Sequence, residues 1–211
     1  MTFVRRCAFV ACALAAGACS LGEGEGDIHT EALNVAECWN GPFRLGPDFF
    51  AAQPYREEAL TIRVQHGGDT EEVSDGAVIL VDNIQAVRAG IAGGKSFKVG
   101  LPPSVVPPGF PIVADPDPPL VHLTLYLHRS CHAQNSALYS ISGNITFTAI
   151  FNGNLNETDA DEKLTEGSFD DIVVGDPRNR DPASPTVKDV SHLDGHFKFY
   201  FQRGQPAQPF P

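Results

Sequence analysis

The chain has 211 residues, of which 42% are hydrophobic, and it carries a formal net charge of −11. This length suits one domain or two small ones, and the hydrophobic fraction argues against wholesale disorder. An acidic excess of this size repels phosphate backbones, so nucleic-acid binding is not expected. The many glycines, prolines and phenylalanines favour short strands joined by turns over long helices.

The N-terminus has the layout of a secretory signal peptide. Arg5 and Arg6 form a positive start, and residues 7–18 follow as an uncharged apolar run. That run is shorter than the roughly 20 apolar residues that a membrane-spanning helix needs. We therefore expect residues 1–18 to be removed on export. Removal takes two of the 15 basic residues and none of the 26 acidic ones, which leaves a mature chain of net charge −13.

Residues 14–19 (LAAGAC) resemble the lipobox of bacterial lipoprotein precursors. The resemblance implies a lipid on Cys19 and cleavage just before it, and Ser20 as the next residue implies sorting to the outer membrane. The sequence departs from the lipobox pattern at Ala16, where leucine is commonest. Residues 16–18 (AGA) also fit an ordinary signal-peptidase site, so a freely secreted protein is the alternative.

The cysteines predict one disulfide. Cys7 and Cys12 leave with the signal peptide and Cys19 takes the lipid, so Cys38 and Cys131 remain in an oxidising compartment. A bridge closing a loop of that length stabilises a fold by roughly 4–5 kcal/mol in the chain-entropy model. The alternatives are two unpaired buried cysteines or a zinc site, which lacks the usual CxxC spacing.

Residues 19–30 are expected to carry the lipid and a Gly/Glu spacer, and residues 31–211 to form one β-rich domain. Hydrophobic residues there alternate with period two, and no segment has a convincing helical period. The clearest alternation is Leu60, Ile62 and Val64 against their polar neighbours. The expected strands are 60–65, 77–81, 96–101, 121–128, 144–151 and 196–202.

The remaining segments read as loops. Residues 102–119 hold eight prolines and are expected to be extended, while 156–166 and 176–194 are polar, the first with a short helix. A Cys38–Cys131 bridge would clamp across the proline loop, which favours one domain. We predict an all-β antiparallel sandwich, with a jelly-roll-like or open-barrel variant as alternatives.

Motifs of catalysis are missing from the sequence, which has no GxSxG, HExxH, Walker or GxGxxG pattern. No catalytic residue, metal ligand or cofactor is therefore assigned. His192 and His196 are four residues apart, a spacing that would put them on one face of a helix. The turn-forming Asp194-Gly195 between them argues against a helix there. Two acidic pairs suggest possible calcium sites, namely Asp115/Asp117 and Asp159/Asp161. An EF-hand loop starting at Asp159 would need Gly at its sixth position and Glu at its twelfth, but Leu164 and Asp170 occupy these positions.

Aromatic and histidine side chains form a possible ligand surface, and all of them except Trp39 are expected on the outward faces of strands. These are Trp39, His122, Tyr126, His128 and Tyr200.

The C-terminal block 195–204 (GHFKFYFQRG), with the proline-rich tail after it, resembles the ending of uncharacterised Gram-negative envelope lipoproteins. That resemblance implies a location in the envelope and no activity. The leading hypothesis is a lipid-anchored, non-enzymatic binding or structural module of the outer membrane, with a protein or glycan partner. The alternatives are a hydrolase of envelope polymers, which needs two facing carboxylates, and a calcium-stabilised or glycan-binding adhesion module.

Overall fold

The computed structural model describes residues 24–107, 115–131, 136–180 and 186–202. The expected signal peptide, Cys19, and residues 203–204 of the C-terminal block with the tail after them lie outside these ranges. Within them no helix has the length and apolar character needed to cross a membrane.

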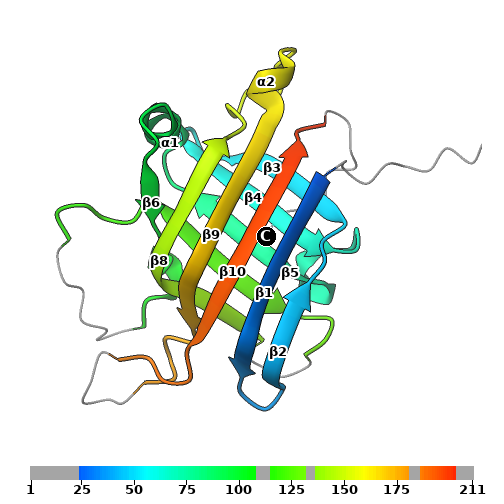
Figure 1. Cartoon of the computed structure of the whole chain (residues 1–211), viewed down its shortest axis with the longest axis vertical. Helices are drawn as coiled ribbons and strands as arrows, with labels where there is room; N and C mark the ends of the chain where they lie inside the picture. The colour runs from blue at the N-terminus through cyan, green and yellow to red at the C-terminus, as the bar shows by residue number, and fades with distance from the viewer. Residues whose placement is uncertain (1–23, 108–114, 132–135, 181–185, 203–211) are drawn as a thin grey trace, which may run out of the picture.

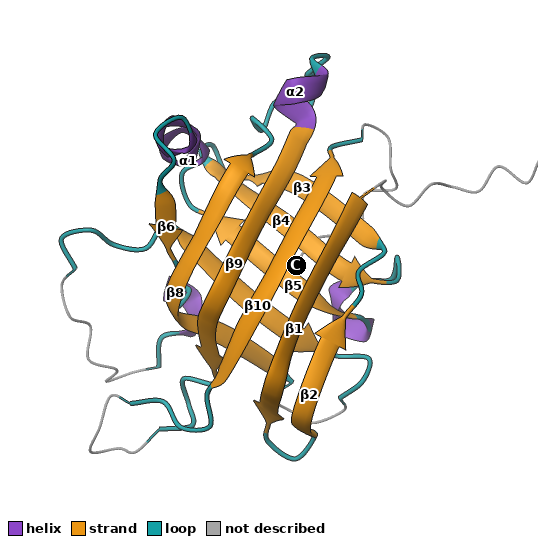
Figure 2. Cartoon of the chain, in the orientation of Figure 1, coloured by secondary structure: helices purple, strands orange, loops and turns teal. Residues whose placement is uncertain are grey.

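Antiparallel strands make up most of the described chain, as predicted (Figure 2). The strands are β1 (Gly24–Val35), β2 (Trp39–Leu45), β3 (Phe49–Tyr55), β4 (Ala59–His66), β5 (Asp75–Val81), β6 (Ser96–Lys98), β7 (Val121–Leu127), β8 (Ala137–Ala149), β9 (Leu164–Gly175) and β10 (Ser191–Tyr200). The helices are α1 (Ile84–Ile91) and α2 (Ala160–Lys163), with short 3-10 turns η1 (Glu71–Val73) and η2 (Pro103–Val105).

The strands form one sheet in the order β2-β1-β10-β9-β8-β7-β5-β4-β3, with β6 added beside β8. Along this path most neighbours are consecutive in the chain, and β1 pairs with β10 from the other end of the sequence. A jelly roll needs Greek-key crossings, which this up-and-down path does not make. The jelly-roll-like alternative is therefore wrong.

The sheet curls into two layers whose strands cross (Figure 1). In front lie β8, β9, β10, β1 and β2, and behind them β3, β4 and β5. β7 pairs along its whole length with β5 but only through Thr124–Tyr126 with β8, so the sheet bends there. This two-layered, all-β arrangement agrees with the predicted sandwich-like class.

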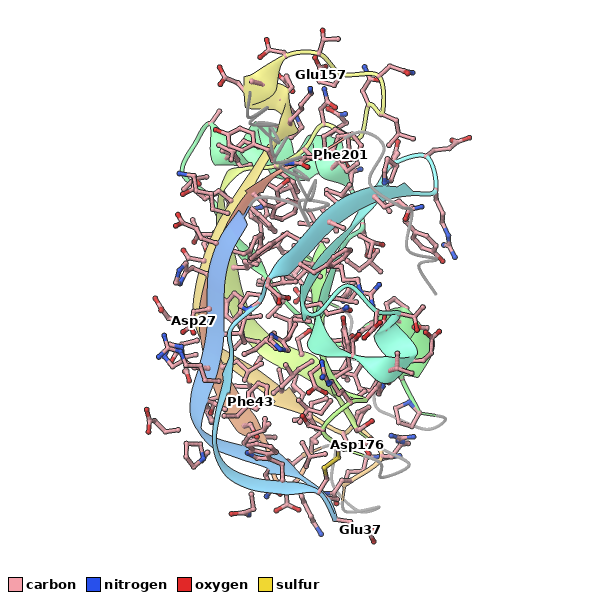
Figure 3. All side chains as sticks on the ribbon, turned by 90° about the vertical axis from the view of Figure 1, so that its right-hand side faces the viewer. Asp27, Glu37, Phe43, Glu157, Asp176 and Phe201 are labelled. Carbon is pink, nitrogen blue, oxygen red and sulfur yellow. A yellow bond between two sulfur atoms is a disulfide. The ribbon has the colours of Figure 1, made fainter. Side chains whose placement is uncertain are left out.

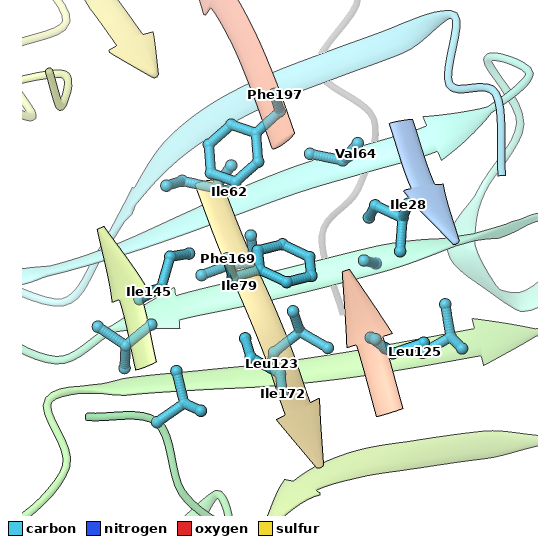
Figure 4. Packing of buried hydrophobic residues seen from close by; sticks show 14 of the residues in the cluster. Ile28, Ile62, Val64, Ile79, Leu123, Leu125, Ile145, Phe169, Ile172 and Phe197 are labelled. Atoms are coloured by element: carbon cyan, nitrogen blue, oxygen red, sulfur yellow. The ribbon is translucent and has the colours of Figure 1, made fainter. Parts of the chain in front are cut away.

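A hydrophobic core fills the space between the layers (Figure 4). Every predicted alternating strand contributes its apolar face, because successive side chains of a strand point to opposite sides. The labelled core includes Ile62 and Val64 of β4, Leu123 and Leu125 of β7, and Phe197 of β10. Burying each such side chain contributes roughly 1.5–3 kcal/mol.

Residues 24–30 were expected to belong to a loose spacer. They belong instead to strand β1. Ile28 and Thr30 are buried, and the strand pairs with β10 from Gly24↔Phe199 onward. A Cβ on Gly24 would lie 2.7 Å from the Phe50 ring. The glycine here allows close packing and is no sign of a flexible segment.

Helix α1 was not expected either. Asn83 caps it by accepting a hydrogen bond from the Ala86 backbone N–H at 2.8 Å, and Ile84 and Val87 face the core. Two buried positions in eight residues are too few to stand out as a helical period. The short helix predicted within 156–166 is present as α2.

The predicted disulfide joins Cys38 to Cys131, whose Cα atoms are 5.7 Å apart. Cys38 lies in the turn between β1 and β2, and Cys131 follows β7 after a short turn. The bridge therefore ties the front layer to the back layer at one end of the molecule, near the labelled Glu37 and Asp176 (Figure 3).

Candidate functional site

Polar side chains are buried on the outer face of the back layer, away from the hydrophobic core. Arg63 and Gln65 of β4 and Tyr126 of β7 are all fully buried there. The Tyr126 hydroxyl donates to Gln65 Oε1 at 2.8 Å and accepts from Arg63 Nε at 3.2 Å. The three side chains form one hydrogen-bonded unit, called the Arg63 network below.

The strand register explains how this network forms. Gln65, Gly76 and Tyr126 lie opposite one another on β4, β5 and β7. A Cβ on Gly76 would stand 2.6 Å from the Tyr126 hydroxyl oxygen, so the ring lies across the glycine to reach Gln65 and Arg63. Burial raises the pKa of Tyr126, which keeps the hydroxyl protonated at neutral pH.

The loop after β4 covers the network. Gln65 Nε2 donates to the carbonyl oxygens of Gly67 and Asp69 at 2.6 and 2.8 Å, and Arg63 donates to the Asp69 carbonyl at 3.1 Å. These bonds direct the chain back over the sheet, so that η1 lies beside the network.

Glu71 opens η1 and lies at the edge of the covered region. His128 stacks on Tyr126 at 5.3 Å between ring centroids, and its Nδ1 lies 2.7 Å from the Glu71 carbonyl oxygen. Burial raises the pKa of the Glu71 carboxyl, and the nearby Arg63 and His128 partly oppose that rise. Within the described residues, the buried Oε2 of Glu71 has no hydrogen-bond partner.

A groove of about 290 Å³ runs from Glu71 across the outer face of β3, β4 and β5. Its side chains are half-buried or exposed, and they alternate with residues that point into the core. The lining residues are Gln53, Pro54, Tyr55, Thr61, Glu71, Val78 and Leu80, and the groove is called the Glu71 groove below.

The register of the strands shapes the floor of this groove. Gln53, Thr61 and Leu80 lie in one row across β3, β4 and β5, and Val78 stands opposite Arg63 in the next row. Tyr55 of β3 also lines the groove. The floor is therefore largely apolar and ends at a single carboxyl group.

The chemistry that this groove offers is recognition. Glycoside hydrolysis uses two carboxyl groups on opposite sides of the bond that breaks. Among the described residues that line the groove, Glu71 is the sole charged side chain. An apolar floor with one polar group at its end can orient a bound molecule, which is how small-molecule sites are commonly built.

On the front layer the register places Ser168, His196 and Asp27 in one row across β9, β10 and β1. These are the residue types of a hydrolytic triad, but both Asp27 oxygens are engaged elsewhere. One accepts from Arg44 Nε at 2.5 Å and the other lies 2.8 Å from His29 Nδ1. In the described structure no hydrogen bond links His196 to Ser168 or Asp27, so the row does not form a relay.

The structure corrects the predicted ligand surface at two residues. Tyr126 has no exposed surface and His122 only 3%. His122 is held between the Gly100 carbonyl oxygen, 2.9 Å from Nδ1, and an Asp82 carboxyl oxygen, 3.0 Å from Nε2. The prediction assumed that the outward side of β7 faces solvent, whereas loops cover that side.

The remaining predicted surface residues do not meet. His128 is half-buried beside Tyr126, and Trp39 packs edge-on against Phe43 with ring centroids 5.6 Å apart. Tyr200 is exposed at the far end of β10, beside Phe201, whereas Trp39 lies next to the disulfide end marked by Glu37 (Figure 3). The five residues therefore do not form one surface.

The acidic pairs considered for calcium have other contacts. Lys98 Nζ lies 3.2 Å from Asp115 Oδ2 and donates to the Asp117 carbonyl oxygen at 3.2 Å, which fastens the proline loop to β6. Asp159 caps α2 by accepting from the Asp161 backbone N–H. Among the described residues there is no group of three or more metal-ligating side chains that could hold an ion.

His192 does not join His196 in a common site. Its Nδ1 lies 2.5 Å from an Asp171 carboxyl oxygen, and both residues are exposed.

The residues of the Glu71 groove were missed by sequence reasoning. Arg63 stands out in the sequence as a charge within an apolar strand, and the alternation correctly places it on the face away from the core. Its burial depends on the loop that folds back over it. Glu71 and Tyr55 lie in segments with no distinguishing motif.

Comparison of the chain with protein families, curated proteins and solved structures found no match.

Proposed function

We propose that the protein is a non-enzymatic binding module of the bacterial cell envelope and that the Glu71 groove is its ligand-binding surface. In this proposal the chain is exported by its N-terminal signal, carries lipid on Cys19 and is held at the outer membrane. A freely secreted form is the alternative if the signal peptide is cut without lipidation. The Cys38–Cys131 disulfide supports an oxidising compartment, because such bridges persist outside the cytoplasm.

The observation that carries the binding role is the exposed apolar floor of the groove beside a half-buried carboxyl group, that of Glu71. Val78 and Leu80 lie on β5, an inner strand of the sheet, yet both keep part of their surface open to solvent. Next to them the same face of the sheet is covered by η1 and the Arg63 network. The uncovered part is therefore a preformed depression on a rigid element, which suits ligand binding.

A titration monitored by two-dimensional NMR tests the binding role. The isotope-labelled, disulfide-bonded chain with Cys19→Ala, which removes any lipid, is titrated with small hexyl compounds. We expect shifts confined to the groove, centred on Thr61, Val78 and Leu80. Leu80→Gln should strongly weaken those shifts, because it replaces an apolar side chain of the floor with a polar one and adds no charge. Shifts spread over other surfaces, or none at all, would rule out the groove as the binding site.

The anchor has a separate test. Cells expressing the protein are fed a labelled fatty acid, and the mature N-terminus is read by mass spectrometry. We expect label on the wild-type chain and none on Cys19→Ala. A mature chain that begins at another residue and carries no label would mean the freely secreted form.

A further inference from the structure

We propose that the Glu71 groove selects an organic cation, namely a primary ammonium group on a short apolar body. This inference rests on the proposed binding function and adds the chemical class of the ligand. The juxtaposition that points to it is a buried carboxyl oxygen without a partner at one end of an apolar floor.

The size and surface of the groove select for a small, partly apolar ligand. Its volume of about 290 Å³ is at the small end of the range for small-molecule sites. Leu80 and Val78 supply aliphatic contact, and Thr61 lies between Leu80 and Gln53 in the same row. A hydrocarbon body lying on these residues removes apolar surface from water, which favours binding.

Glu71 selects the polar group of the ligand. Its buried Oε2 is shielded from water and accepts no hydrogen bond among the described residues. A carboxyl group with one buried oxygen left without a partner is short of hydrogen bonds, so a ligand that brings a donor to the part of Glu71 that lines the groove compensates for that loss. An ammonium group supplies both the donor and the opposite charge, and hydrogen bonds between charged groups are the stronger ones.

The surrounding charges favour a cation over a neutral or anionic ligand. Within the described structure the groove is lined by one negative group and no positive one. Arg63 interacts with Glu71 through its charge, but its guanidinium does not line the groove and donates hydrogen bonds to Tyr126 and to the Asp69 carbonyl. Arg56 is held against Tyr55, with its guanidinium carbon 5.0 Å from the ring centroid. The whole chain is also acidic, which repels anions.

Three probes of the same length separate charge from apolar contact. Hexylammonium, 1-hexanol and hexanoate are titrated separately into the isotope-labelled Cys19→Ala protein at low salt. We expect hexylammonium to bind roughly tenfold more tightly than 1-hexanol, with shifts at the groove, and hexanoate to bind most weakly. A neutral methyl glycoside serves as the probe for a glycan site.

Matched variants test whether Glu71 is the selecting group. Glu71→Gln keeps the shape and removes the charge, so hexylammonium and 1-hexanol should then bind alike. Glu72→Gln removes the neighbouring exposed carboxylate, which does not line the groove, and should keep the preference. Thr61→Lys leaves Glu71 in place and puts an ammonium group in the groove, so it should also abolish the preference. That variant tests the inference independently if Glu71→Gln folds poorly.

The outcomes distinguish this inference from the proposed function. Equal binding of hexylammonium and 1-hexanol at the groove of the wild-type protein would overturn the cation class and leave the binding role standing. Binding of the methyl glycoside in preference to hexylammonium would overturn it in favour of a glycan. If no probe shifts the groove residues, both proposals fail. Loss of the preference in Glu72→Gln to the same extent would show that general acidity, and not Glu71, attracts the cation.

Discussion

Tyr126 joins Arg63 and Gln65 through one hydroxyl group, and all three side chains are excluded from solvent. Such a network stabilises a fold only when its members remain paired, because an unpaired buried donor or acceptor costs more than a hydrogen bond contributes. The hydroxyl is therefore the most sensitive point of the Arg63 network.

Tyr126→Phe should lower the free energy of unfolding by about 1–3 kcal/mol, because it leaves Arg63 Nε and Gln65 Oε1 without this partner. Tyr200→Phe is the matched control, since Tyr200 is exposed, and should change stability by less than about 0.5 kcal/mol. Urea unfolding measures both. Equal effects from the two variants would show that the network does not contribute as argued.

Glu71 and Glu72 are neighbours whose carboxyl pKa values are shifted in opposite directions. Burial raises the pKa of Glu71 above its ordinary value of 4.5. Hydrogen bonds from its own backbone N–H and from the Thr70 side chain lower the pKa of the exposed Glu72. The folded state therefore holds the Glu71 proton more tightly than the unfolded state does, and the Glu72 proton less tightly.

The sign of each pH effect follows. The stability contribution of Glu71 is fully present below pH 4.5 and is lost as the pH rises through its raised pKa. The contribution of Glu72 is present above pH 4.5 and is lost as the pH falls through its lowered pKa. Relative to wild type, Glu71→Gln should gain stability as the pH is raised from acid to neutral, and Glu72→Gln should lose it. Urea unfolding across that range checks both, and parallel curves would contradict the assigned burial of Glu71.

At the scale of elements, β1 is the clearest departure from what the sequence indicated. Its first residues, Gly24 to Asp27, read as a spacer because glycines and acids dominate them. Their strand conformation depends on β10, which lies at the other end of the chain. The Phe50 ring of β3 packs on both glycines, and Phe199 Cβ of β10 packs on Gly24.

Gly24→Ala tests whether this segment is packed. A methyl group there would meet the Phe50 ring at 2.7 Å and Phe199 Cβ at 2.8 Å, so we expect a loss of about 1–3 kcal/mol. Gly46→Ala is the control, because its Cβ would meet nothing within 4 Å. Thermal unfolding compares the two. A neutral Gly24→Ala would favour the original interpretation of this segment as a spacer.

Local alternation was enough to predict the strands whose apolar and polar residues strictly take turns, such as β4, β7 and β10. It did not predict β9, where a bulge at Asp171 with a positive φ of 60° interrupts an acid-rich sequence. The Glu71 groove could not be predicted for a related reason. Alternation gives the face on which Arg63 or Tyr126 lies, but not which loop covers that face.

At the scale of the whole molecule, the two ends differ in what holds them. The Cys38–Cys131 bridge ties the layers together at one end. At the other end β1 begins at Gly24, directly opposite Phe199, so that Tyr200 and the start of β1 lie close together. A lipid on Cys19 would be separated from Gly24 by residues 20–23 alone, and a chain spans at most about 3.5 Å per residue. Under the proposed anchor, the Tyr200 end must therefore lie within roughly 18 Å of the membrane.

The single tryptophan of the chain reports on this orientation. Trp39 begins β2, after the full length of β1, which at about 3.3 Å per residue places it roughly 40 Å from Gly24 along the strand. In vesicles that contain lipids with a quencher on the headgroup, the fluorescence of Trp39 in the lipidated protein should be little affected. The double variant Trp39→Phe with Tyr200→Trp should be strongly quenched, because its reporter lies beside the anchored end. Quenching of Trp39 and not of the new reporter would mean that the disulfide end faces the membrane, which a tether this short at β1 does not allow.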